Sequence, residues 1–316
     1  MLLKEIMLKH LTLFICVLFT TISASAQSWP TRPIKLVVPF PPGGLIDNMA
    51  RLISGKLSQE LGQPIVIENK PGAGGNIGAT DVSKATPDGY TLLMASPPLT
   101  ISPALYSKLP YKPESLSPIG LIGRVPNVLV VSPDSGIQSL TELTSKAKSQ
   151  PGFLNYASNG QGTSLHLSAE LYKSMANVFI THIPYRGAAA GLTGVIAGEV
   201  NLMFDNLPSA LGLIQSGKLR ALAVTTQQRS NALPQVPTME EAGIKGYQVS
   251  AWFGLAAPTG LPANVQTRIE QALQTVSQQS DTKASMVKVG AEPTWLNAQA
   301  MSQFMQTDYA QWKKVA

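Results

Sequence analysis

Residues 34–51 read IKLVVPFPPGGLIDNMAR, and this stretch decides how the chain folds. The apolar run at 34–38 predicts a buried strand, and apolar residues at helical spacing from about Asp47 onward predict a helix. The loop at 39–44 is rich in proline and glycine, so it is rigid and its backbone can approach a ligand closely. A loop of this kind at a helix start presents N–H groups and a partial positive charge to an anion. Because it lacks the lysine of a nucleotide-binding P-loop, the sequence favours a small acid as ligand.

The rest of the chain repeats this order of a short apolar run followed by a helical pattern. Further strands are predicted at 65–67, 90–94, 179–183, 200–204 and 219–224. Short strands that alternate with helices predict α/β sheets of mainly parallel strands flanked by helices. The segment 96–111 is rich in proline and is expected to be irregular. Pro126 is expected to interrupt the apolar run at 121–131.

The distinctive loops fall into two groups, which predicts two lobes with a ligand cleft between them. Ligands of parallel α/β sheets bind at the carboxyl ends of the strands. Candidate loops at such ends lie at 40–47, 72–76 and 96–100 in the first group, and at 158–163, 185–187 and 205 in the second. The segments near 122–131 and 247–257 are the expected crossovers. We therefore predict one lobe from residues 27–124 plus 253–316 and a second lobe from residues 125–252.

The N-terminal 26 residues have the pattern of a secretory signal peptide. Two lysines precede a short apolar run, and Ala24-Ser25-Ala26 is a small-residue cleavage pattern. We expect cleavage after Ala26 and export to the periplasm. The one cysteine of the sequence, Cys16, lies within this segment, so the mature chain is expected to have no disulfide and no thiolate metal ligand.

Composition and motifs exclude several functional classes. The net charge of +6 is small for 316 residues, and no basic stripe predicts nucleic-acid binding. The glycines at 72–78 lack the spacing of a dinucleotide-binding fingerprint. No Gly-x-Ser-x-Gly elbow and no histidine pair at metal-ligand spacing is present, so we expect neither an enzyme, nor a metal, nor a cofactor. His166 and His182, the two histidines after the signal peptide, are expected to be structural.

In the first group of loops, the candidate ligand-binding residues combine backbone donors with their supports. Gly43 and Gly44 either present N–H groups to a carboxylate or form a tight turn. Asp47 would repel an anion, so it is expected to support the loop; the alternative is a helix cap paired with Arg51. Phe40, Pro42 and Ser96 are further candidates at the same edge of the cleft. Gly74, in the glycine-rich loop, is another.

In the second group of loops, hydroxyls and backbone donors are the candidates. Ser158, Gly162 and Thr163 precede a predicted helix, where the hydroxyls either bind a carboxylate or cap the helix. Tyr185 and the Gly187 N–H are favoured over the guanidinium of Arg186 as ligand contacts. Asp205 ends an apolar strand; it binds a ligand amino group, holds a bridging water, or caps the helix that follows Pro208.

The order of motifs along residues 29–254 resembles that of the periplasmic solute receptors of tripartite tricarboxylate transporters, the Bug or TctC type. The resemblance covers essentially the whole mature chain and rests on a dozen ordered segments. They include WPTRPIK at 29–35, VPFPPGG at 38–44, ENKPGAGGN at 68–76, PDGYT at 87–91, IPYRG at 183–187, MFD at 203–205 and GKLRALAVT at 217–225.

The resemblance implies a two-lobed receptor, expected to be a monomer, that closes on a small carboxylate and delivers it to a membrane permease. The ligand would be gripped by loops of both lobes, largely through backbone groups and ordered water. Dicarboxylates, tricarboxylates, acidic amino acids and aromatic acids stay open as ligands. Such receptors commonly carry threonine before the loop aspartate, and Ile46 stands there in this chain. Two alternatives also stay open: a sensory receptor for a two-component kinase and, more distantly, a periplasmic enzyme.

Overall fold

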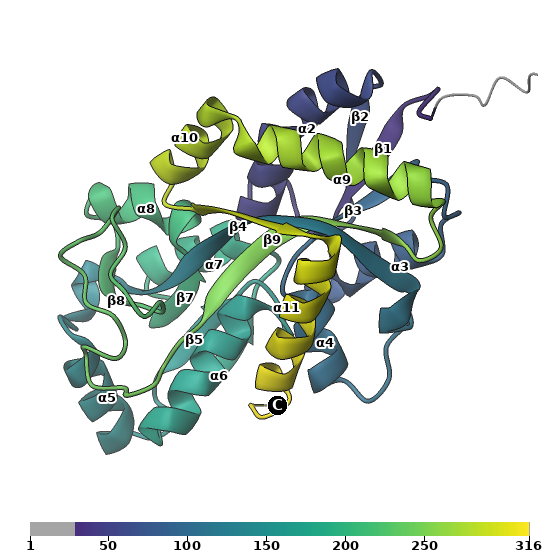
Figure 1. Ribbon diagram of the computed structural model, residues 1–316. Helices are drawn as coiled ribbons and strands as arrows, with labels where there is room; N and C mark the ends of the chain where they lie inside the picture. Colours follow the sequence, from purple (N-terminus) through teal and green to yellow (C-terminus); the bar gives the residue numbers. More distant parts are fainter. Residues whose placement is uncertain (1–28, 316) are drawn as a thin grey trace, which may run out of the picture.

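The computed structural model describes residues 29–315. The predicted signal peptide, its cleavage after Ala26 and Cys16 lie outside these residues. Ten strands form one continuous curled sheet in the order β2-β1-β3-β9-β4-β7-β5-β6, with β8 and β10 also paired to β4 (Figure 1). Within residues 29–315, no helix has the length and apolar character needed to cross a membrane.

The first lobe combines N-terminal and C-terminal parts of the chain. Its N-terminal elements are β1 (Ile34–Val38), α2 (Leu45–Leu61), β2 (Ile65–Asn69), the 3-10 helix η1 (Ala73–Gly75), α3 (Asn76–Ser83), β3 (Thr91–Ala95), α4 (Pro98–Leu105) and the 3-10 helix η2 (Pro113–Ser115). Its C-terminal elements are α9 (Ala263–Gln278), α10 (Ser280–Lys288), β10 (Glu292–Asn297) and α11 (Ala298–Trp312). Strand β1 pairs in parallel with both β2 and β3, which sets three strand ends side by side.

The second lobe is formed by the middle of the chain. Its elements are η3 (Pro133–Ser135), α5 (Leu140–Ser149), β5 (Asn155–Ser158), α6 (Ser164–Ala176), β6 (Thr181–Pro184), α7 (Ala188–Ile196), β7 (Leu202–Asn206), α8 (Leu207–Gln215) and β8 (Arg220–Val224). Strand β5 lies parallel to both β6 and β7. The loops after these three strands therefore face the loops of the first lobe.

Two long strands connect the lobes. Strand β4 (Leu116–Val131) and strand β9 (Ser250–Pro258) are antiparallel to each other, and β4 continues into antiparallel pairs with β7 and β8. The predicted crossovers near 122–131 and 247–257 fall on these strands. Pro126 does not interrupt β4, contrary to expectation; it pairs opposite Ser250, at the end of β9, where a missing N–H donor is tolerated.

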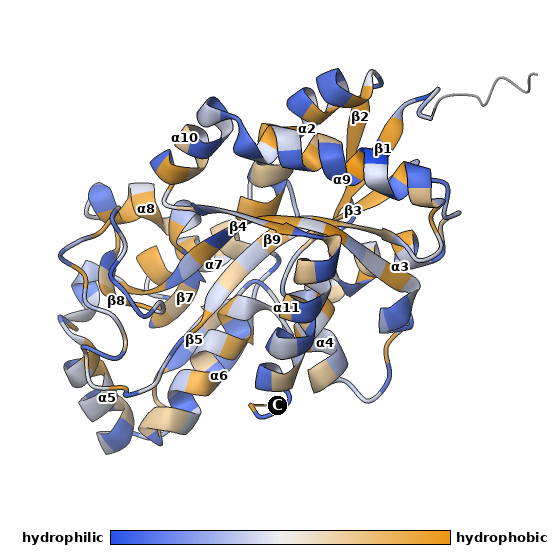
Figure 2. Ribbon diagram, in the orientation of Figure 1, coloured by the Kyte–Doolittle hydropathy of each residue, from blue (hydrophilic) through white to orange (hydrophobic). Residues whose placement is uncertain are grey.

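Each lobe has its own apolar interior. In the first lobe, the residues at helical spacing on α2 and α9 pack against the sheet, and Figure 2 shows both helices with an apolar and a polar side. In the second lobe, Tyr172, Phe204 and Tyr247 form an aromatic core. Helix α11 lies beside α4 (Figure 1) and brings Trp312 into this second core.

The segment 96–111 was expected to be irregular, and this prediction is wrong for α4 (Pro98–Leu105). Pro98 occupies the first turn of α4, where a missing N–H costs nothing and its fixed φ suits the helix. Helix α2 also begins two residues earlier than the predicted start at Asp47, because Gly44 is its N-cap.

Candidate functional site

A cavity of about 750 Å3 lies between the two lobes. Loops at the carboxyl ends of strands contribute most of its wall, as expected for parallel α/β sheets. It is lined by Phe40, Pro41, Pro71, Gly72, Ala73, Gly74, Gly75, Tyr106, Asn159, Gly160, Gln161, Tyr185, Arg186 and Gly187. A smaller cavity of about 70 Å3 continues past Phe40 toward Pro42, Gly44, Ile46 and Asn206. Of the predicted residues, the structure thus places Phe40, Gly74, Tyr185 and Gly187 on the large cavity, and Pro42 and Gly44 on the small one.

Asp47 holds the loop after β1 from inside the first lobe. Its side chain is 1% exposed and accepts hydrogen bonds from the Gly43 N–H at 2.9 Å, from Arg51 Nε at 2.8 Å and from Asn69 Nδ2 at 2.9 Å. Asn69 Nδ2 also donates to the Phe40 carbonyl at 3.0 Å. Asp47 is not the helix cap, since Gly44 occupies that position. The contacts fit the supporting role expected for Asp47.

These donors keep Asp47 ionised. Burial alone would raise the pKa of Asp47, but the hydrogen bonds from Arg51, Gly43 and Asn69 outweigh burial and lower the pKa below its usual value. The first lobe therefore fixes its cleft loop with a charge that is fully compensated. Gly43 was predicted to donate its N–H to a ligand. In the structure it donates to Asp47 instead, so Gly43 is part of the loop support.

The glycine-rich loop of the first lobe adopts a backbone that side chains rarely allow. Gly72, Gly74 and Gly75 have φ values of 125°, 63° and 100°. Gly75 caps α3 without any side-chain hydrogen bond, and Gly187 caps α7 in the same way across the cavity. In α3 the first N–H groups are already used, since Asn76 donates to the Ala73 carbonyl and Ile77 to the Gly72 carbonyl. The start of α7 keeps its first-turn N–H groups available beside the cavity.

The hydroxyls predicted as ligand donors in the second lobe are engaged within the protein. Thr163 is the N-cap of α6, where Oγ1 accepts from the His166 N–H and donates to the Gly160 carbonyl at 2.7 Å. Ser158 Oγ contacts His182 Nε2 at 2.7 Å and accepts from the Gly160 N–H at 3.1 Å. Both side chains are buried, so of the two readings left open for Thr163, the helix cap describes the structure.

Asp205 differs from Asp47 in having no compensating partners. Its side chain on β7 is 0% exposed. Neither carboxyl oxygen has a hydrogen-bond partner among the described residues. Burial raises the pKa of Asp205 to about 7, and the nearby backbone N–H of Asn206 offsets only part of this. Asn206, not Asp205, caps α8, so the capping role considered for Asp205 is wrong.

Seven of the predicted residues line neither interlobe cavity: Gly43, Asp47, Ser96, Ser158, Gly162, Thr163 and Asp205. Ser96 is 3% exposed behind the end of β3, and Asp205 is enclosed by its lobe. Conversely, Tyr106 and Asn159 line the cavity but were not among the predicted residues. Asn159 Oδ1 is buried there without a hydrogen-bond partner in the described chain, so it is a candidate polar contact.

The lobes touch on both sides of the cavity. A Cβ on Gly74 would overlap the carbonyl oxygen of Gln161, and a Cβ on Gly160 would lie 3.4 Å from Gly74 Cα. On the other side, a Cβ on Gly187 would lie 3.3 Å from Pro41 Cγ. At these contacts between loops of opposite lobes, glycine allows the backbones to meet.

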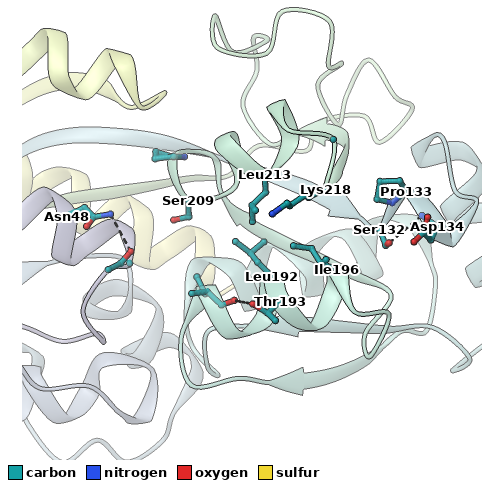
Figure 3. Close-up of a pocket in the computed structure, with 16 residues that line it drawn as sticks. Asn48, Ser132, Pro133, Asp134, Leu192, Thr193, Ile196, Ser209, Leu213 and Lys218 are labelled. Atoms are coloured by element: carbon teal, nitrogen blue, oxygen red, sulfur yellow. Dashed lines mark hydrogen bonds between the residues drawn. The ribbon is translucent and has the colours of Figure 1, made fainter.

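A second hollow of about 740 Å3 lies outside this cleft (Figure 3). Leu192, Ile196 and Leu213 gather on its floor beside Lys218, with Asp134 at one end and Asn48 of the first lobe at the other. We call it the α7–α8 groove. Its wall includes the first turns of α7 and α8 and the α2 N-cap Gly44, and the predicted residues Gly43 and Gly44 both line it.

A family model and the sequences of known proteins point to the same family. Residues 49–316 match the family described as Tripartite tricarboxylate transporter family receptor (TctC). Protein BugT of Bordetella pertussis is 36% identical over 294 residues, covering 92% of this chain and 90% of BugT.

Solved structures of similar proteins have the same two-lobed fold. Rpa4515 of R. palustris with adipate has a TM-score of 0.88 and 38% identity, with 91% of this chain and 97% of that chain covered. MatC (Rpa3494) from Rhodopseudomonas palustris with bound malate has a TM-score of 0.86 and 33% identity, covering 91% of this chain and 99% of that chain.

Proposed function

Because the chain belongs to the tripartite tricarboxylate transporter family of receptors, we propose that it is an exported receptor that binds a small carboxylate between its two lobes. The mature protein would begin at Gln27 and act in the periplasm. Residues 27–124 plus 253–316 and residues 125–252 would move as the two lobes of a monomer, with β4 and β9 as the hinge strands. The protein would release its ligand unchanged to the permease of a membrane transporter.

One observation carries this proposal: the start of α7 meets the glycine-rich loop of the opposite lobe at the same cavity. Gly187 caps α7 without a side-chain hydrogen bond, so first-turn N–H groups of α7 remain for a ligand. Arg186, an exposed side chain, is the one charged residue that lines the cavity in the described chain, and its charge is positive. Partial and full positive charges without an acidic neighbour in the wall favour an anion.

The wall also supports an apolar body in the ligand. Phe40, Tyr106 and Tyr185 contribute aromatic surface. Two similar proteins have structures with adipate and with bound malate. We therefore propose a small dicarboxylate as the ligand, with adipate and malate as the first compounds to test. Ile46 lines the small cavity instead of a hydroxyl-bearing residue, which favours an apolar part of the ligand at that end.

Closure would also give the permease a feature to recognise. The α7–α8 groove is lined by residues of both lobes, Asn48 on one side and Leu213 and Lys218 on the other, so its width depends on closure. We expect Lys218→Glu to reduce transport in cells while leaving ligand binding by the purified protein unchanged. Equal transport by wild type and variant would remove the groove from this role.

A thermal-shift screen tests the proposed function. The protein comprising residues 27–316 is heated with adipate, malate, other small carboxylates and their neutral amides. A ligand at about 100 times its Kd adds roughly 2.7 kcal/mol to the native state, which raises Tm by several degrees for a chain of this size. A shift with a carboxylate but not with its amide supports the proposal. Equal shifts with acid and amide would contradict it.

A further inference from the structure

The two histidines of the described chain lie against each other beneath the cleft loop of the second lobe. His166 belongs to the first turn of α6, and His182 belongs to β6, opposite Tyr156 of β5. Their ring centroids are 4.4 Å apart, with an angle of 37° between the planes. They are separated by 16 positions in the sequence, so only the fold brings them together.

Each imidazole holds the loop at 158–163. His166 Nδ1 accepts a hydrogen bond from the Gly162 N–H at 3.4 Å. His182 Nε2 contacts Ser158 Oγ at 2.7 Å, and that oxygen in turn accepts from the Gly160 N–H. Because an imidazole nitrogen accepts only when it carries no proton, the contact with Gly162 requires neutral His166.

The loop held in this way is also where the lobes meet. Gly160 and Gln161 touch Gly74 of the first lobe, and a Cβ on Gly162 would lie 3.4 Å from the Tyr106 ring. A change in the loop therefore changes both the cavity wall and the contact between the lobes.

The surroundings of the pair disfavour a positive charge. Tyr156 stacks on His182 at 4.8 Å, and its hydroxyl donates to Glu170. Glu170 is the one acidic group near the pair in the described chain, at 4.0 Å from His166 Nε2, and it already binds Lys173 Nζ at 2.7 Å. Burial, with the charges of His182 and Lys173, lowers the pKa of His166 to about 4, and Glu170 opposes this shift. Burial also lowers the pKa of His182.

We propose that the His166–His182 pair positions the cleft loop of the second lobe and acts as a proton-sensitive lock on closure. Protonation of His166 replaces its acceptor at Nδ1 with a donor that faces the Gly162 N–H, and a second proton would place two charges at stacking distance. The loop then leaves its closed position, and the ligand is released in acid. The predicted release of the ligand rests on the proposed function. The coupling between the two histidines and the loop at 158–163 does not.

Nuclear magnetic resonance tests the coupling directly, because an untagged protein of residues 27–316 has two histidine signals. The imidazole Cε1–H signals and the amide signals of Gly160 and Gly162 are followed from about pH 7.5 to about pH 3. We expect both imidazoles to stay neutral well below their usual titration range, and both glycine signals to move with the midpoint of His166. Titration of the histidines near their usual pKa, or glycine signals that do not follow them, would overturn the proposal.

A variant tests the consequence for binding, with adipate as the probe. His166→Gln keeps an acceptor for Gly162 but cannot take up a proton. Between about pH 7 and about pH 3 we expect adipate affinity to fall roughly tenfold more in the wild type than in the variant, because about pH 3 lies one unit below the His166 pKa of about 4. The titration of adipate itself is common to both proteins. An equal fall in both contradicts the lock.

If adipate binds at neither pH, the choice of ligand in the proposed function is at fault. The glycine signals of the ligand-free wild type still decide the coupling between the histidines and the loop. A positive coupling without adipate binding would keep the lock and redirect the search for the ligand. Adipate binding without coupling would keep the receptor and discard the lock.

Discussion

The two lobes hold their cleft loops by opposite means. In the first lobe, the ionised side chain of Asp47 is compensated by Arg51, Asn69 and the Gly43 N–H. In the second lobe, buried His166 and half-buried His182 contact the loop through their imidazoles, and Asp205 lies near the cleft end of β7 without hydrogen-bond partners in the described chain. Burial alone does not decide the charge of these four groups; the number of donors and acceptors around each group does.

This difference predicts that the two loops lose stability in acid over different pH ranges. The pKa of Asp47 is lowered, so its contribution to stability is present above its usual pKa and is lost only as the pH falls below it. The pKa of His166 is about 4 when folded and about 6.5 when unfolded, so stability is lost as the pH falls between these values. In moderate acid, the contribution of His166 should therefore be lost before that of Asp47.

The largest effect is expected where the two loops meet. In Gly74→Val, the new Cβ overlaps the Gln161 carbonyl oxygen and the backbone at φ 63° is strained. We expect carboxylate affinity to fall at least about 100-fold, as for a closed state made inaccessible. Gly62→Val is the matched control, because Gly62 has φ 74° but nothing within 4 Å of an added Cβ. Calorimetric titration should show near-normal affinity for the control; equal losses in both would refute a role for the lobe contact.

Removing the charged support of the first loop should cost stability. Asp47→Ala leaves the Gly43 N–H and Asn69 Nδ2 without their acceptor, and the free energy of unfolding should fall by about 2–3 kcal/mol. Denaturant unfolding at neutral pH measures this loss. Asp134→Ala, an exposed aspartate on η3, is the control and should be within about 0.5 kcal/mol of wild type. A loss in Asp47→Ala no greater than in the control would end the comparison between the loops.

Asp205 should give the opposite sign. Its folded pKa of about 7 lies above the usual 3.8, so wild-type stability falls as the pH rises between these values and is level above about 7. Asp205→Asn removes this dependence, and its stability relative to wild type should rise by about 2 kcal/mol from about pH 5 to about pH 8. Thermal unfolding of both proteins across this range measures the change. A constant difference would mean that Asp205 is ionised throughout.

The smallest change concerns Asn69, which links the Phe40 carbonyl to Asp47. Asn69→Ala removes both hydrogen bonds but leaves the ion pair with Arg51, so we expect a loss of about 1 kcal/mol. Carboxylate affinity should fall with it, because Phe40 lines the cavity. If Asn69→Ala were as damaging as Asp47→Ala, the amide rather than the carboxylate would be the main support.

Local patterns predicted the fold well and the site in part. The strand, glycine loop and helix at 34–51 could be recognised because each depends on neighbouring residues. Helix α4 could not, because Pro98 and Pro103 resemble breakers until the first-turn position of Pro98 is known. Tyr106, which follows α4, was missed for the same reason.

Contacts between distant residues left no sequence signal. The histidine pair arises because β5 and β6 pair in parallel while α6 crosses them, and no spacing along the chain encodes that. Whether a hydroxyl binds a ligand or caps a helix is likewise undecided by sequence: Thr163 proved to be a cap. The division of the lobes and the ligand contacts of the predicted residues stay predictions.

A structure determined with bound ligand tests the central claim, that the cavity between the two loops is the carboxylate site. The protein is crystallised with the carboxylate that gives the largest thermal shift. We predict ligand density between Phe40 and Tyr185, with a carboxylate group at the start of α7. Density in the α7–α8 groove beside Lys218, with the interlobe cavity free of ligand, would contradict the account.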